Sequence, residues 1–433
     1  MTHMRRVRTM ARMLVAITLT VTMLYGSAFA TSGDNIRLIV TFKNINLKNS
    51  LDYIAVSSLL TTLGSNVVQD LLFINALAIE LPVDLLSEVL KLLNSLDEIE
   101  VVDDLISLVD PTCPTSTLQL IPETYPWGLQ QINVPPAHEQ WPESQGSGVK
   151  VAILDTGIDQ THLSVGEFSN RGAGGYNALA GKGSYADDNG HGTHMAGIIA
   201  SALNSVGITG AAPKAKLVGV KVLDKSGAGY LSDVVNGLEW VYNNNIRLVN
   251  ISLGFAADSK PLRQAIKLLH ERGVIMVASA GNRCAADPGQ EDGGGADCRG
   301  GPAAACDDPL TSVLYPAAYD EVIAVAASDM YDRITDYSLP GSQVEVTAPG
   351  GTSGSGRILS TDTVGGYGLG YGTSQAAAHV TAAIALVLQQ KPGISLKDVR
   401  DLLRSTAEDL GDPKERQGAG RIDVENMLRK LLP

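Results

Sequence analysis

The sequence predicts an α/β protein with a mostly parallel sheet and helices on both faces, preceded by a small α+β domain. Two observations predict this. After residue 126, short apolar runs alternate with helical segments, which is the order of a parallel sheet joined by helical crossovers. Before residue 110, the segments follow in the order βαββαβ, which is typical of a ferredoxin-like domain.

Residues 1–30 have the three parts of a secretory signal peptide. Four arginines precede the apolar stretch 13–24, and Ala28-Phe29-Ala30 closes it with small residues at the cleavage-type positions. A membrane anchor is the alternative, but the apolar stretch is much shorter than the roughly twenty residues needed to span a bilayer. We therefore expect a secreted protein, extracellular or periplasmic, without a membrane attachment after signal cleavage.

The small domain is assigned to residues 31–110. The expected strands are 36–42, 67–73, 76–81 and 99–103, and the expected helices are 48–63 and 82–94, with Pro82 opening the second helix. No cluster of catalytic residue types lies in this part. The polar, proline-bearing segment 111–125 follows, and it predicts an exposed linker that a protease can cut.

The large domain is assigned to residues 126–433. Its expected strands are 149–154, 217–223, 248–253, 274–280, 322–327 and 344–348, and its expected helices are 191–203, 231–243, 260–271, 396–406 and 423–431. Polar residues follow three of these strands, at Asp155, at 252–254 and at Asn282. Because ligands of a parallel sheet bind beyond the carboxyl ends of its strands, these positions predict a cleft.

Ser374 begins a further apolar helix. Gly372 and Thr373 precede it, and helix-compatible residues continue to Leu388 without a proline. Free amides and the positive end of the helix dipole at such a terminus stabilise negative charge, as acyl transfer to a serine requires. A serine that merely caps a helix is the simpler interpretation when this stretch is considered alone.

Composition excludes some functions. The 433-residue chain has a formal charge of −13 and a pI near 5.0, which argues against a nucleic-acid partner.

In an exported protein, Cys113, Cys284, Cys298 and Cys306 are disulfide candidates; zinc is the alternative, but the usual ligand spacings are absent. The acidic region 284–308 is a surface loop that is either solvated or binds calcium.

Three motifs carry a resemblance. Asp155-Thr156-Gly157, the stretch from Asn189 to Gly197 containing His191, and Gly372-Thr373-Ser374 occur in the order Asp, His, Ser. From about residue 127 to residue 426 the chain resembles the subtilisin family of serine endopeptidases. The resemblance implies that Asp155, His191 and Ser374 form the catalytic triad.

The chemistry requires the same residue types. A serine hydroxyl is a weak nucleophile, so it needs a base that accepts a proton near neutral pH, which His191 supplies. Asp155 would fix the tautomer of the imidazole and stabilise its protonated form. His194 is interpreted as structural.

The resemblance also assigns the remaining site residues. Ser279-Ala280-Gly281-Asn282 resembles the oxyanion-hole segment of the family, with Asn282 as a donor. Ser252, Leu253 and Gly254 match the strand that pairs with the substrate backbone. The chain departs from the family pattern at Ala378, where proline is common, and at Thr381-Ala382, where an alanine-glycine pair is usual.

By the same resemblance, residues 31–110 are expected to be a propeptide that inhibits the enzyme, with self-cleavage between Cys113 and Tyr125. An unrelated βαββαβ binding module is the alternative. Glu123 and Asn204 match ligands of a structural calcium site, but Ser164 stands where a carboxylate is expected. Asp187 and Asp188 suggest a preference for a basic residue beside the scissile bond.

We therefore expect a secreted serine endopeptidase, made as a zymogen and acting on proteins or peptides. No cofactor is expected for the chemistry, and structural calcium is left open. The expected partners are substrates and the protein's own propeptide, without nucleic acid, and the protein is expected to be a monomer. The competing hypothesis is a catalytically silent relative that binds proteins.

Overall fold

The structure is a computed structural model that describes residues 35–432, apart from gaps at 44–45, 49, 63, 83–84, 87–88, 91–92, 94–98, 109–112, 115–122, 165, 180–182 and 284–310. The signal-peptide prediction and the acidic loop with Cys284, Cys298 and Cys306 lie outside the described residues. The chain divides into two compact units, Met1–Asp104 and Leu105–Pro433.

The smaller unit contains a four-stranded antiparallel sheet in the order β2-β3-β1-β4. Its elements are β1 (Asn35–Phe42), α2 (Ser50–Thr62), β2 (Asn66–Leu71), the short η1 (Leu72–Ile74), β3 (Ala76–Pro82) and β4 (Ile99–Asp103). Leu38 and Val40 of β1 lie opposite Ile79 and Leu77 of β3, and all four side chains are buried. These pairs form the core that the alternating apolar pattern predicts.

One detail of the smaller unit differs from the sequence prediction. Pro82 is the last residue of β3, not the first residue of the following helix. A proline is tolerated there because the end of a strand does not need its missing N–H for the ladder. The described residues between 85 and 93 are helical, as expected.

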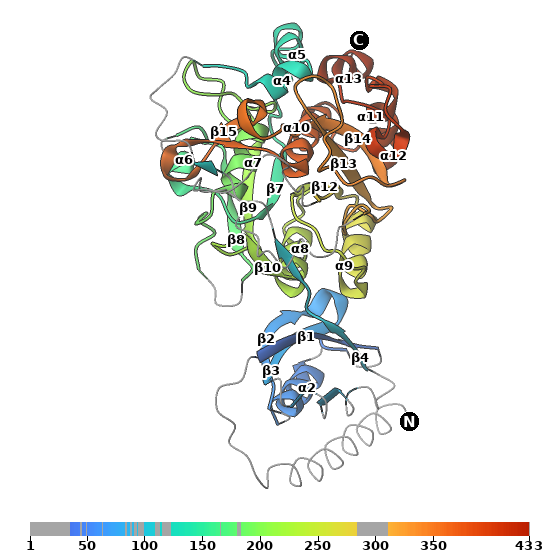
Figure 1. The fold of residues 1–433 in the computed structure, drawn as a ribbon. Coiled ribbons are helices and arrows are strands. Elements are labelled where there is room, and N and C mark those ends of the chain that lie inside the picture. The colour runs from blue at the N-terminus through green and yellow to red at the C-terminus, as the bar shows by residue number, and fades with distance from the viewer. Residues whose placement is uncertain are drawn as a thin grey trace, which may run out of the picture. The chain divides into compact units, whose positions relative to one another are not determined.

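The larger unit is built on a seven-stranded parallel sheet in the order β14-β13-β12-β11-β7-β9-β8 (Figure 1). The strands are β7 (Lys150–Asp155), β8 (Gly172–Asn177), β9 (Lys216–Lys221), β11 (Leu248–Ile251), β12 (Ile275–Ser279), β13 (Val322–Ser328) and β14 (Val344–Pro349). Six of them were predicted. The sequence analysis missed β8, because Gly-Ala-Gly-Gly-Tyr-Asn lacks the β-branched residues that mark a strand.

Helices cover both faces of this sheet, as predicted. α7 (His191–Ala200) packs on α10 (Thr373–Gln390), and both contact the sheet on one face. On the other face, α8 (Leu231–Asn243) lies against the sheet and contacts α9 (Lys260–Glu271) (Figure 1). Alternate residues of each strand serve the two faces: Leu217 belongs to the core with α10, whereas Val220 lies against Gly237 of α8.

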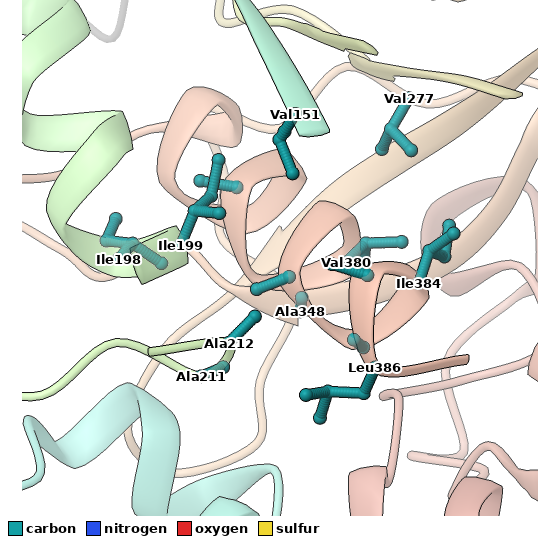
Figure 2. Packing of buried hydrophobic residues seen from close by; sticks show 14 of the residues in the cluster. Val151, Ile198, Ile199, Ala211, Ala212, Val277, Ala348, Val380, Ile384 and Leu386 are labelled. Atoms are coloured by element: carbon teal, nitrogen blue, oxygen red, sulfur yellow. The ribbon is translucent and has the colours of Figure 1, made fainter. Parts of the chain in front are cut away.

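α10 is the centre of the core. Residues 373–388 are all buried, because the helix is enclosed by the sheet on one side and by other helices on the rest. Figure 2 shows Val380, Ile384 and Leu386 of α10 among Val151 of β7 and Ile199 of α7. Within the part of the chain that the structure describes, no helix has both the length and the apolar character needed to cross a membrane.

Shorter elements complete the larger unit. They are β5 (Ile106–Leu108), β6 (Cys113–Pro114), α4 (Trp127–Gln131), α5 (Val134–Gln140), α6 (Gln160–Ser164), β10 (Ala228–Tyr230), η4 (Gly354–Gly356), β15 (Ile358–Thr361), η5 (Thr363–Gly365), β16 (Tyr367–Gly370), α11 (Leu396–Thr406), α12 (Lys414–Gln417) and α13 (Val424–Leu431). Two small antiparallel sheets pair β5 with β10 and join β15, β16 and β6.

Candidate active site

Asp155 and His191 meet at the carboxyl edge of the parallel sheet. Asp155 is the last residue of β7 and His191 is the first residue of α7; both are buried, at 0% and 1% exposed. Nδ1 of His191 lies 2.7 Å from Oδ1 and 2.9 Å from Oδ2 of Asp155. A carboxylate in this position orients the imidazole so that its other nitrogen can act as a base.

The backbone around this pair is closely packed. The Thr156 amide donates to Oδ1 of Asp155 at 2.7 Å, and the Gly192 amide donates to the Thr156 hydroxyl at 2.9 Å. A Cβ on Gly192 would lie 2.2 Å from the carbonyl oxygen of Gly157. Glycine after the histidine is therefore required for α7 to begin this close to the end of β7.

Ser374 is the second residue of α10, in the first turn of a buried helix as the sequence predicts. Its side chain is 8% exposed, and Oγ donates to the carbonyl oxygen of Ser252 at 3.3 Å. The positive φ of 150° at Gly372, directly before the helix, belongs to backbone that only glycine adopts readily. The hydroxyl is thereby held at a helix N-terminus beside the end of β11.

Asn282 is held against the turn that carries Ser374. Its Oδ1 accepts from the Thr373 amide at 3.0 Å and from the Thr373 hydroxyl at 2.8 Å, while Oγ1 of Thr373 accepts from the Gly281 amide at 3.1 Å. Because Oδ1 is used in this way, Nδ2 is the end of the side chain that can donate to a substrate. Thr373 is a supporting residue that the sequence analysis did not single out.

A chain of buried hydrogen bonds fixes Ser252. Oγ1 of Thr381 donates to Oδ1 of Asn250 at 2.9 Å, Nδ2 of Asn250 donates to Oγ of Ser252 at 2.8 Å, and Ser252 Oγ donates to the Ser374 carbonyl at 3.3 Å. Thr381 is one of the positions where the sequence departs from the family pattern. The hydroxyl group at this position is the sequence feature that could have indicated the contact with Asn250. The chain connects the third turn of α10 to the end of β11.

Lys221 is a buried residue near the site that the sequence analysis missed. It ends β9, opposite Asp155 in the register, and Nζ donates to the carbonyls of Thr156 and Leu223 and to Oδ1 of Asp188 at 2.6–2.9 Å. The Asp187 carboxylate accepts from the amides of Asn189, Gly190 and Thr193 and from the Thr193 hydroxyl. Both carboxylates have partners within the described structure, and the predicted preference for a basic substrate residue stays a prediction.

His194 is structural, as predicted. It is fully buried, and its Nε2 lies 3.2 Å from the Ile358 carbonyl oxygen. Burial, together with the nearby His191, lowers the pKa of His194 to about 3. The ring is therefore neutral at ordinary pH and packs in the core instead of exchanging protons with a substrate.

The residues expected to bind structural calcium are hydrogen-bonded to loop amides in the described structure. The Glu123 carboxylate accepts from the amides of Asn204 and Ser205 at 2.7 and 3.0 Å, and Oδ1 of Asn204 accepts from the Val206 amide. Ser164 donates to a backbone carbonyl of its own helix. Among the described residues, no group of three or more His, Cys, Asp or Glu side chains is placed to hold a metal ion.

Glu167 anchors the loop that runs from Asn204 to Ile208. It is buried; its Oε1 accepts from the Tyr367 hydroxyl at 2.5 Å and from the Ile208 amide at 3.1 Å. Its Oε2 has no hydrogen-bond partner within the described structure. Burial raises the pKa of this carboxyl group above its ordinary range.

The parallel sheet and the contacts at its carboxyl edge define an α/β protein with the groups that acyl transfer to a serine requires. Comparison with known proteins specifies the family: residues 146–420 match the subtilase family, so the chain belongs to it. It is 36% identical over 327 residues to an alkaline protease of Alkalihalobacillus alcalophilus, covering 76% of this chain and 75% of that protein. It is also 37% identical to Subtilisin Savinase of Lederbergia lenta, over 71% of this chain and all of the relative. The protein is a serine endopeptidase.

Proposed function

We propose that the protein hydrolyses peptide bonds in proteins through an acyl-enzyme on Ser374. His191 accepts the serine proton during attack and returns it to the leaving amine, and Asp155 keeps the imidazole in the required tautomer. The observation that carries this proposal is the contact between Nδ1 of His191 and both oxygens of Asp155, at the sheet edge where Ser374 begins α10.

Asn282 stabilises the tetrahedral intermediate in this proposal. The carbonyl oxygen of the substrate becomes negatively charged when Ser374 attacks, and it accepts from Nδ2 of Asn282 and from the Ser374 amide. Support comes from the two bonds that Oδ1 of Asn282 makes to Thr373, because they fix the side chain before substrate binds. A donor oriented in advance costs no reorganisation during the reaction.

The substrate backbone pairs with Ser252, Leu253 and Gly254 and with β10. Such pairing uses main-chain groups, so it gives affinity for many extended sequences. Support comes from β5, which already pairs with β10 in an antiparallel register, and from Ser107, whose hydroxyl donates to the Gly254 carbonyl at 2.9 Å.

The decisive experiment is covalent labelling with a fluorophosphonate probe, which reacts only with an activated serine. We expect the wild-type protein to be labelled and to hydrolyse casein, and Ser374→Ala to do neither. Ser360→Ala is a control, because this buried serine donates to the His194 carbonyl away from the proposed chemistry. A wild-type protein that stays unlabelled after processing would favour the catalytically silent alternative.

We further propose that the enzyme is made as a zymogen whose own chain occupies the cleft. β5 pairs with β10, and β6 pairs with β16, the strand that leads directly into the turn before Ser374. β5 ends at Leu108 and β6 begins at Cys113, so we expect the segment between the two strands to be the one that reaches the proposed nucleophile. The bond that is cut should therefore fall between Leu108 and Cys113, upstream of the stretch from Cys113 to Tyr125 that the sequence suggested.

This placement has a consequence for the cysteines. If the cut falls before Cys113, the mature enzyme keeps all four cysteines, an even number that allows two disulfides. N-terminal sequencing and the intact mass of the purified enzyme measure the position of the cut, and Ser374→Ala should accumulate the uncut precursor. A mature protein that retains residues 35–104 would contradict the propeptide role and favour a binding module.

We also propose that the protein is exported. The support is the composition of residues 1–30 and the name of one relative, the Minor extracellular protease Epr of Bacillus subtilis, which is 38% identical over 66% of this chain and 38% of that protein. Deleting residues 2–30 should keep the protein inside the producing cell. Detection of the deleted form in the culture medium at wild-type levels would contradict export through this segment.

A further inference from the structure

One buried ammonium group bonds to the segments on both sides of the Asp155–His191 pair. Lys221 is 4% exposed, and its Nζ donates at 2.6 Å to the carbonyl oxygen of Thr156, the residue after Asp155. The same nitrogen donates at 2.6 Å to Oδ1 of Asp188, which lies in the turn that leads into His191. Lys221 therefore connects the end of β7 to the segment before α7.

The sheet determines the direction of this side chain. Lys221 lies opposite Asp155 in the register of β9 with β7, and neighbouring strands of a sheet are about 4.8 Å apart (Figure 1). Leu217, four residues earlier on β9, belongs to the core that contains α10, so Lys221 points to the same face of the sheet. This is also the face on which α7 carries His191.

The bond to Thr156 reaches both members of the pair. The Thr156 amide donates to Oδ1 of Asp155 at 2.7 Å, and the Thr156 hydroxyl accepts from the amide of Gly192, the residue after the histidine. The third bond of the Lys221 ammonium group goes to the Leu223 carbonyl at 2.9 Å, so all three of its donors are used. Thr156 is thus held at its carbonyl by Lys221 and at its amide by Asp155.

Lys221 also brings a positive charge to the buried pair. A cation near an imidazole disfavours the protonated ring, whereas an anion favours it. The Asp188 side chain is 55% exposed, whereas that of Lys221 is 5% exposed. Water screens an exposed charge more than a buried one, so Asp188 offsets the effect of Lys221 on the imidazole only in part.

The other ionisable groups that surround His191 keep their own contacts. Asp155 contacts its Nδ1 directly, and His194 on the same helix is neutral because burial lowers its pKa. Asp187 accepts from backbone amides before and within α7. Asp224, which follows β9, accepts from the backbone amides two and four positions later in the chain. A change confined to Lys221 or its partner leaves these contacts in place.

We propose that Lys221 is a positioning residue for the Asp155–His191 pair. It holds both residues in place and, together with Asp188, sets the pH at which the imidazole becomes a base. This proposal rests on the proposed function and adds a determinant of the pH range of the same site. A lysine with only a structural role would affect stability but would leave the pH dependence of the reaction unchanged.

The test measures kcat/KM against pH with a fluorogenic peptide and the processed enzyme. The acid limb, where kcat/KM rises with pH, reports the proton on the catalytic base of the free enzyme. Lys221→Met removes the buried charge, so it should move this limb at least about 0.3 pH unit toward higher pH. Because the positions of Asp155 and His191 also change, kcat should fall by about 10-fold with KM nearly unchanged.

Asp188→Asn tests the charge separately from the contact. Asparagine keeps an oxygen that accepts from Lys221 but removes the opposing charge, so the acid limb should move toward lower pH, by less than in Lys221→Met. The double variant should lie between the two single variants. Lys225→Met is the matched control: this lysine is exposed, so its limb should stay within about 0.1 pH unit of wild type.

Titration with the fluorophosphonate probe first establishes the amount of active protein in each variant. Shifts of the same sign in both single variants, or an acid limb that neither variant moves, would overturn the proposal. If Lys221→Met does not fold, Asp188→Asn decides alone, and an unchanged limb or one that moves toward higher pH contradicts the proposal. A wild-type protein that the probe does not label would instead be a failure of the proposed function.

Discussion

Two buried carboxylates in the larger unit are used in different ways. Asp155 is 0% exposed, and both of its oxygens contact Nδ1 of His191 while Oδ1 also accepts from the next amide in the chain. Glu167 is 4% exposed, and only Oε1 has partners in the described structure. The first carboxylate orients a proposed catalytic base, whereas the second holds a loop to β16.

The difference teaches what burial of a carboxylate can achieve. A buried charge is tolerated when it is paired and hydrogen-bonded, and it then fixes the position of its donor. A carboxylate with one unpartnered oxygen is costly when ionised, so it favours its protonated form. We therefore expect changes at Asp155 to alter the rate of the reaction and changes at Glu167 to alter stability and its dependence on pH.

The largest effect is expected for Asp155→Asn. Asparagine keeps the size of the side chain, but its amide cannot hold the imidazole in the required tautomer, so kcat should fall by about 10⁴-fold, the scale measured for triad aspartates. Steady-state kinetics on the processed enzyme measure this loss. Because proton transfer should be affected more than binding, KM should change little. A fall of less than about tenfold would separate Asp155 from the chemistry.

The next effect concerns Asn282→Asp. Aspartate retains an acceptor for the Thr373 amide and hydroxyl but removes the Nδ2 donor and adds negative charge where the oxyanion forms. We expect kcat to fall by about 10²-fold to 10³-fold, a range taken from removal of such a donor in a subtilisin, a member of this family. Thr373→Val, which keeps Asn282, is the control and should lose much less. Equal losses in both variants would mean that Asn282 only supports the turn.

The sheet, its helices and the site residues at its carboxyl edge were predictable from sequence. They were predictable because each depends on residues that lie close together in the chain. Asp155, His191, Asn282 and Ser374 each lie in a short motif at the end of a strand or the start of a helix, and the topology of a parallel sheet brings such ends to one edge. The sheet, its helices and the position of Ser374 followed from local periodicity. The glycine-rich β8 did not, because its backbone is held by the register with β9.

The contacts that sequence reasoning missed join residues far apart in the chain. Glu167 depends on Ile208 and on Tyr367, 41 and 200 positions away, and no local pattern links them. The resemblance drew attention to Glu123 and Asn204, but their hydrogen bonds to loop amides depend on the path of the backbone. Side-chain partners across such distances require coordinates.

A third prediction concerns Lys221, which supports the catalytic edge without taking part in the proposed chemistry. Lys221→Met keeps the length of the side chain but leaves the carbonyls of Thr156 and Leu223 and the Asp188 carboxylate without their shared donor. We expect the free energy of unfolding to fall by about 3 kcal/mol, the order found for lost bonds to a charged donor. Urea unfolding in a Ser374→Ala background measures it without self-digestion. Lys225→Met, at an exposed lysine, should change stability far less.

The smallest effect, and the sharpest test of the comparison, is Glu167→Gln. Burial raises the pKa of Glu167 in the folded state, so its contribution to stability is complete below the unfolded pKa and is lost as pH rises through the folded pKa. Glutamine can still accept from Tyr367 and Ile208 through its oxygen but never ionises. The variant should therefore gain stability relative to wild type as pH rises from 4 toward 8, with catalytic rate unchanged.

Urea unfolding of the Ser374→Ala protein at several pH values measures this gain, and Glu139→Gln, at an exposed carboxylate of α5, is its control. Since Glu139 lies in water in both states, its replacement should give a difference that does not vary with pH. If Glu167→Gln behaves in the same way, the carboxyl group ionises as easily in the folded protein as in the unfolded chain. Oε2 of Glu167 would then be solvated in solution. Asp155 and Glu167 would still differ in their hydrogen-bond partners, but ionisation of Glu167 would not lower the stability of the folded protein.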